Sequence, residues 1–93
     1  METKVRVKRI IQNTNSTINE DTKHIKYYFI GETICERPVT LYFCVLNGDD
    51  KTKTVIVENG CTYNVHYDIL ITNIEEKLHS YVVCWKADEI LCD

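Results

Sequence analysis

The sequence predicts a small, mainly β protein whose strands close into an antiparallel barrel. The first observation is alternation: apolar residues recur at every second position in runs such as 39–45 and 63–71. Successive side chains of a strand point to opposite faces, so this pattern indicates sheets that bury one face. The second observation is that Asn-Gly, the strongest short hairpin signal, occurs at 47–48 and 59–60. Together they favour several short strands joined by tight turns.

The length and composition fit one compact domain. The chain has 93 residues, which corresponds to a single β domain over residues 1–93. Its composition, 44% hydrophobic and 27% charged, is that of an ordinary soluble globule. No apolar run approaches the ~20 residues that span a bilayer, and the N-terminus lacks the continuous apolar stretch of a signal peptide. We therefore expect a cytoplasmic protein without a membrane partner.

In the N-terminal half, the first strand turns Val5 and Val7 inward, and the polar stretch Asn13–Thr22 forms a loop. Gly31, near the end of the second strand, marks a bulge or a close approach of the backbone. Pro38 suits the start of the third strand. Counting the C-terminal half as well, the expected strands are Lys4–Gln12, Lys23–Gly31, Val39–Leu46, Thr54–Glu58, Tyr63–Thr72 and Ser80–Lys86.

In the C-terminal half, the turn at Asn59-Gly60 joins the fourth and fifth strands, which predicts an antiparallel meander of strands three, four and five. Asn73 and Glu76 have the spacing of a helix capping box, so at most two helical turns are expected through His79. The closing segment, Ala87–Leu91, is expected to form a short turn or helical cap.

Six short strands in so small a chain suit a closed or nearly closed barrel, because closure removes exposed edges. An oligonucleotide-binding (OB)-like barrel is the first choice. Such a barrel usually carries a helix between its third and fourth strands, whereas the corresponding gap here, Asn47–Lys53, is too short for one. A small sandwich or another six-stranded barrel therefore stays open.

The five cysteines are odd in number and include no C-x-x-C pair. Cys44 and Cys84 fall inside expected strands, where a free cysteine behaves as a small buried hydrophobe. A disulfide framework or a zinc site would require closer, paired spacing. We expect reduced structural thiols, no metal site and no cofactor.

Charge is unevenly distributed along the chain. Residues 1–26 carry six bases and three acids, whereas residues 27–93 carry five bases and eleven acids. The basic N-terminal third indicates a positive face on an acidic body. Solvated strand edges explain the same pattern, since lysine at an edge also discourages aggregation.

The outward positions of the first three strands would form one basic, aromatic surface. Single-stranded nucleic acid requires this mixture, because cations follow the phosphates while flat rings stack on bases. Packing alone also favours tyrosine in strands, and Tyr28 with Tyr42 could instead be a cross-strand pair or part of a protein interface. The candidate nucleic-acid-binding residues are Arg6, Lys8, Lys23, His24, Lys26, Tyr28 and Tyr42.

Catalytic signatures are missing from the sequence. None of the histidines lies in a recognisable motif with a serine or cysteine nucleophile, and there is no Gly-rich phosphate loop. The acidic pairs, Asp49-Asp50, Glu75-Glu76 and Asp88-Glu89, fall at expected turns, where solvation or capping explains them. We expect no catalytic residues and no enzyme activity.

The C-terminal run from Tyr81 to Leu91 ends an aromatic strand with Trp85-Lys86-Ala87-Asp88-Glu89-Ile90. It resembles the end of a family of small proteins encoded by Gram-positive conjugative elements. The resemblance implies an OB-like β domain that acts as a helicase-processivity or single-strand DNA accessory factor. It carries over no binding residue, because the matching segment is a closing strand.

The leading hypothesis is a non-enzymatic accessory protein of a phage or mobile element that binds single-stranded nucleic acid. The alternative is a small phage or mobile-element protein that binds and inhibits a host protein. Its acidic C-terminal two-thirds would then present a nucleic-acid-like surface to a basic host site.

Overall fold

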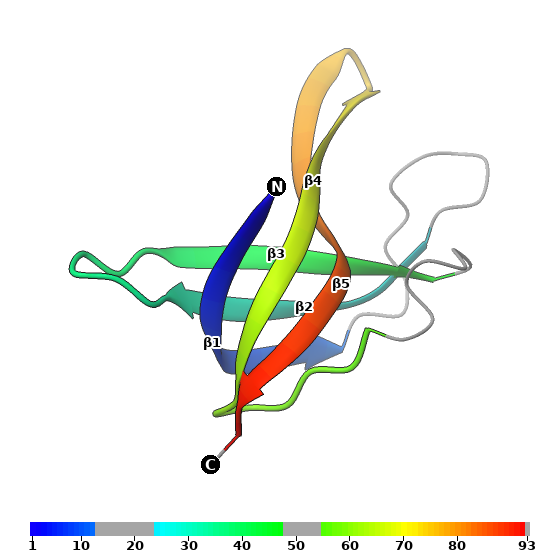
Figure 1. The fold of residues 1–93 in the computed structure, drawn as a ribbon. Helices are drawn as coiled ribbons and strands as arrows, with labels where there is room; N and C mark the ends of the chain where they lie inside the picture. Colours follow the sequence, from blue (N-terminus) through cyan, green and yellow to red (C-terminus); the bar gives the residue numbers. More distant parts are fainter. Residues whose placement is uncertain (13–23, 48–54, 93) are drawn as a thin grey trace.

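A computed structural model of the protein describes residues 1–12, 24–47 and 55–92. The fold is all-β, as expected, but it has five strands rather than six, and no helix occurs within these ranges. Figure 1 shows the strands wrapped around one another, with both termini on the outside. The strands are β1 (Glu2–Gln12), β2 (His24–Thr33), β3 (Thr40–Asn47), β4 (Thr62–Ile74) and β5 (Lys77–Leu91).

The five strands form a closed barrel in the order β1-β2-β3-β5-β4. The long β1 strand closes it, because residues 2–6 pair with β4 while residues 5–12 pair with β2. All neighbours are antiparallel except β3 and β5, which run parallel where Cys44 pairs with Val83. This arrangement is an OB-like barrel, so the sandwich that the sequence left open is excluded.

The fourth expected strand, Thr54–Glu58, is wrong: residues 55–58 pair with no strand, and Thr54 lies outside the described residues. Val55 and Val57 nevertheless lie in the core, while Ile56 between them is 71% exposed. Their alternation reflects burial of every second side chain without a ladder. The expected meander of strands three to five is therefore also wrong, although the turn at Asn59-Gly60 is confirmed, with Gly60 at a φ of 84°.

The helix expected after Asn73 is wrong as well. Glu75 and Glu76 have φ values of 50° and 66° and form the turn of a β-hairpin between β4 and β5. The ladder continues from this turn to the pair Thr62↔Leu91, so residues 87–91 are strand rather than turn or cap. The four residues 73–76 are compatible with either a helix cap or a hairpin turn, and the long pairing of β4 with β5 favours the turn.

The outer half of this hairpin, residues 69–82, extends beyond the barrel and is called the arm below (Figure 1, yellow and orange). Its strands pair with each other from Ile69↔Val82 to Ile74↔Lys77. Ile71 and Leu78, on one face of the arm, are 65% and 77% exposed. The arm is therefore an extension of the sheet beyond the closed core.

Aromatic rings from β2 and β3 fill the middle of the barrel. Phe29 and Phe43 are fully buried, and their ring centroids lie 4.9 Å apart in a stacked arrangement. Gly31 confirms the expected close approach, because a Cβ atom there would lie 2.9 Å from Cβ of Val5 on the neighbouring strand. The buried residues of this main core are Val5, Val7, Tyr27, Phe29, Phe43, Val45, Val55, Val57, Cys61, Tyr63, Val65 and Cys84.

The prediction that all thiols are reduced is wrong for two of them. Cys61, at the turn before β4, forms a disulfide with Cys92, just after β5. Their separation of 31 residues hides the pairing in the sequence, because only the β4–β5 ladder brings the two ends together. Cys44 and Cys84 are free and buried, as expected, and Cys35 is free and exposed. Among the described residues no helix is long and apolar enough to cross a membrane.

Candidate functional site

A β-bulge in β1 determines which bases share a face with the tyrosines. The register shifts between Val7 and Arg9, leaving Lys8 as the extra residue. A bulge re-aims the side chains that follow it. Arg9 thus pairs with Ile30, which pairs in turn with Tyr42 of β3. Directly paired residues of antiparallel strands share a face, so Arg9 and Tyr42 lie in one row on the outside of the barrel.

The next outer row contains the second tyrosine. Ile11 pairs with Tyr28, Tyr28 with Cys44, and Cys44 with Val83 of β5. Leu70 and Tyr81 of the β4–β5 hairpin pack over this part of the outer face and partly cover it. A second apolar cluster forms outside the main core; its buried members are Ile25, Cys44, Leu46 and Val83, with Tyr28, Leu70 and Tyr81 packed against them.

A pocket opens between this face and the arm. Its volume is about 150 Å³, and we call it the tyrosine pocket. Tyr42 is 61% exposed, while Cys44 is only 2% exposed. Burial raises the pKa of the Cys44 thiol to about 11, so this thiol is uncharged at neutral pH. The lining residues are Tyr28, Tyr42, Cys44, Ser80, Tyr81 and Val82.

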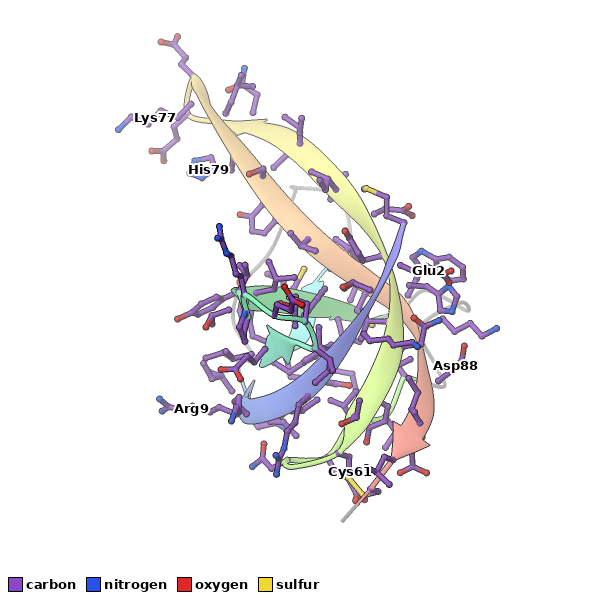
Figure 2. All side chains as sticks on the ribbon, turned by 60° about the vertical axis from the view of Figure 1, so that its left-hand side comes forward. Glu2, Arg9, Cys61, Lys77, His79 and Asp88 are labelled. Atoms are coloured by element: carbon purple, nitrogen blue, oxygen red, sulfur yellow. A yellow bond between two sulfur atoms is a disulfide. The ribbon has the colours of Figure 1, made fainter. Side chains whose placement is uncertain are left out.

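Cations lie on the first two strands, beside the rows that bring Tyr28 and Tyr42 to the pocket. Arg6 pairs with Glu32, which pairs with Thr40, forming the outer row beyond that of Arg9 and Tyr42. Lys26 is exposed at a second register shift, between Ile25 and Tyr27 of β2. Figure 2 shows the side chain of Arg9 pointing away from the barrel.

The predicted site residues are only partly brought together. Tyr28 and Tyr42 share the pocket, on neighbouring rows rather than as a direct cross-strand pair. Arg6, Lys8 and Lys26 are exposed on the same two strands, as expected. Lys23 lies outside the described residues. His24 pairs with Asn47 at the start of β2, and its side chain is not among those described.

The sequence interpretation missed Arg9 and Tyr81. The signal for Arg9 was present, because the apolar alternation changes phase between Val7 and Ile10, with two consecutive bases between them. Such a phase change is the mark of a bulge. Tyr81 gave no comparable signal, because it reaches the pocket through the pairing of β3 with β5.

A different set of charges occupies the outer face of β1, β4 and β5. His66 Nδ1 lies 3.3 Å from a carboxylate oxygen of Glu2, and His66 Nε2 lies 3.0 Å from one of Asp88. The ring of His66 also packs against Trp85, with centroids 5.2 Å apart. Figure 2 shows Glu2 and Asp88 on the side of the barrel opposite Arg9. The carboxylates on this face therefore have local partners and lie away from the tyrosine pocket.

One cluster has metal-ligating atom types. The ligand atoms of Glu58, Cys61 and Cys92 lie within 4.8 Å of one another. The disulfide between the two cysteines occupies both sulfur atoms, which leaves one exposed carboxylate. The cluster is consequently a structural link between the two ends of the β4–β5 hairpin.

Comparisons with protein-family models, with curated proteins and with solved structures give no match for this chain. The resemblance of the C-terminal segment to proteins of conjugative elements stays a prediction. The residues of the tyrosine pocket and the cations of β1 and β2 must therefore carry the functional argument.

Proposed function

We propose that the protein is a non-enzymatic accessory factor that binds single-stranded nucleic acid across the outer face of β2 and β3. The observation that carries this proposal is the tyrosine pocket on that face, with Arg9 in the row of Tyr42. In OB-like barrels, the face of the second and third strands and the loops beside it are where oligonucleotides bind.

The tyrosine rings and the cations of β1 and β2 would bind different parts of a nucleotide. Tyr28, Tyr42 and Tyr81 provide ring faces on which bases stack, at roughly 1–3 kcal/mol per base. Arg6, Arg9, Lys8 and Lys26 provide charge for the phosphates. Stacking accepts every base, so this arrangement supports binding with little sequence specificity.

The alternative, inhibition of a host protein through an acidic surface, is less well supported. Glu75 and Glu76 lie at the tip of the arm, whereas Asp88 and Glu89 pair with Asn64 and Tyr63 at the other end of the hairpin. Acids so far apart do not make one surface that imitates a nucleic acid. The pair at residues 49–50 lies outside the described residues.

The setting of this activity is part of the proposal. We infer a protein of a phage or mobile element that acts with a helicase or on exposed single strands in the cytoplasm. The disulfide is the observation that argues against the location, because such bonds are more usual in oxidising compartments.

Fluorescence anisotropy with a labelled single-stranded DNA oligonucleotide tests the proposal. Tyr42→Ala should weaken binding about fivefold or more, because one stacked base is worth roughly 1–3 kcal/mol. Tyr42→Phe keeps the ring and should bind as the wild type does. Equal affinities for the alanine and phenylalanine variants would refute stacking at this position.

The cationic contribution has its own matched pair of variants. Arg9→Ala should weaken binding and reduce the slope of affinity against salt by about one unit, since each phosphate contact releases counterions. Lys86→Ala removes another exposed charge, on the opposite face beside Asp88, and should leave affinity unchanged. If the two variants weaken binding equally, binding depends on the overall positive charge of the protein and not on the position of Arg9.

A further inference from the structure

We propose that the tyrosine pocket holds one single-ring base of a bound strand, so that the protein prefers pyrimidine-rich over purine-rich strands. This inference rests on the proposed function and adds the ligand class of its central subsite. The argument uses the size of the pocket, its lack of charge and the way its walls are held.

Size is the first consideration. The pocket volume is about 150 Å³. An engineered protein cavity of about 150 Å³ holds one benzene molecule, so the space corresponds to one six-membered ring. A purine carries a second, fused ring, which would extend past the rim. A pyrimidine can therefore enter more completely than a purine.

Charge is the second consideration. The lining contains three tyrosines, a cysteine, a serine and a valine, and no ionised side chain. The Cys44 thiol, its most buried member, is neutral because burial raises its pKa. Moving a phosphate into such a lining would be costly without a charged partner. An uncharged nucleobase thus enters the pocket, while its phosphate stays outside, near the lysine and arginine side chains of β1 and β2.

The width of the pocket is set by two elements that are joined at its base. Tyr28, Tyr42 and Cys44 belong to the paired strands β2 and β3, and the residues from Ser80 to Val82 belong to the arm. The parallel pairing of Cys44 with Val83 ties these walls together next to the pocket. A fixed width is what allows a site to discriminate by ring size.

The test compares labelled oligo-dT and oligo-dA of about 15 nucleotides, within the site size of an OB-like barrel. The wild type should bind oligo-dT about tenfold more tightly, the least that a misfit of one small group costs in a shaped pocket. Stronger self-stacking of oligo-dA would also favour oligo-dT, so the ratio alone does not decide.

A change in pocket size separates these causes, because self-stacking of the DNA is the same for every variant. Cys44→Ala enlarges the pocket and should lower the dT-to-dA affinity ratio severalfold by improving oligo-dA binding. Ser80→Leu narrows it from an exposed position and should weaken oligo-dT binding. Because Ser80 lies outside the core, this second variant keeps the test valid if Cys44→Ala does not fold.

The outcomes distinguish the inference from the proposed function. An unchanged dT-to-dA ratio in Cys44→Ala, with unaltered oligo-dT binding in Ser80→Leu, overturns the pyrimidine pocket while the proposed function stands. Equal wild-type affinities for oligo-dT and oligo-dA would also overturn the pyrimidine pocket and leave the proposed function standing. If neither oligonucleotide binds at low salt, the proposed function fails and the inference fails with it.

Discussion

Tyr27 is a residue at which burial and ionisation are linked. Its side chain lies in the main core, and its hydroxyl donates a hydrogen bond to the carbonyl oxygen of Val55, 3.0 Å away. Burial raises the pKa of Tyr27 from 10.0 to about 12. Burial likewise raises the pKa of the Cys84 thiol from 9.0 to about 12. These groups are neutral in the fold and ionise more easily when the chain unfolds.

The first prediction is alkaline destabilisation. Each of these groups contributes stability that is complete below its unfolded-state pKa and is lost as pH rises towards its folded-state pKa. The free energy of unfolding should therefore fall between about pH 9 and pH 12. Urea titrations at a series of pH values measure this fall. Tyr27→Phe should make it shallower, and an identical pH profile would contradict the assignment.

The second prediction concerns Gly31. An alanine there would place its Cβ 2.9 Å from both Cβ and Cγ2 of Val5. The Cβ atom of Val5 is bonded directly to the backbone, so rotation of the side chain cannot relieve this contact. Gly31→Ala should lower the free energy of unfolding by about 1–3 kcal/mol, the usual cost of overpacking. Thr40→Ala, at an exposed position in the adjacent strand, should change it by less than about 0.5 kcal/mol. Comparable urea midpoints for the two variants would rule out this close approach.

At the scale of elements, the β4–β5 hairpin has an unfavourable turn. Glu75 and Glu76 both adopt positive φ, a conformation that suits Asn-Gly and that glutamate rarely takes. Charge repulsion between adjacent carboxylates adds to the cost. The long ladder on either side of the turn holds this conformation in place.

The third prediction follows from this turn. The double variant Glu75→Asn with Glu76→Gly should raise the free energy of unfolding by about 1 kcal/mol, because both residues then accept positive φ. Glu75→Gln with Glu76→Gln removes the same charges but keeps both side chains, and should recover only a small part of the gain. Thermal and urea unfolding measure both. Equal stabilisation in the two double variants would assign the effect to charge alone.

The sequence predicted the strands and the faces of their side chains only where the local alternation of apolar residues determines them. Alternation placed Tyr28 and Tyr42 outward because a strand's period of two leaves little choice. It did not reveal that residues 55–58 lack a partner strand, since extended chain has the same period with or without a ladder. The bulge at Lys8 turns Arg9 outward into the row of Ile30 and Tyr42, and this depends on pairing with β2.

At the scale of the molecule, two long-range links complete the structure. The parallel pairing of β3 with β5 joins Cys44 to Val83, and the disulfide joins Cys61 to Cys92. Neither has a local sequence signature, because each depends on how distant segments meet. For this reason the tyrosine pocket, which needs Tyr81 from the arm, could be predicted only in part.

The fourth prediction concerns the disulfide. It closes a loop across a separation of 31 residues, and the loss of such a constraint typically costs about 2–4 kcal/mol. Reduction, or Cys92→Ser, should lower the free energy of unfolding by that order, whereas Cys35→Ser at an exposed free thiol should not. Alkylation of the denatured, unreduced protein should label three of the five cysteines. Labelling of all five would contradict the bond.

The measurement that tests the central claim most directly is titration of the isotope-labelled protein with a single-stranded oligonucleotide, followed by NMR. We predict that resonances of Tyr28, Tyr42, Tyr81 and Arg9 shift together, while those of His66 on the opposite face stay unchanged. Shifts concentrated around His66, or no shifts at low salt, would contradict binding at the tyrosine pocket.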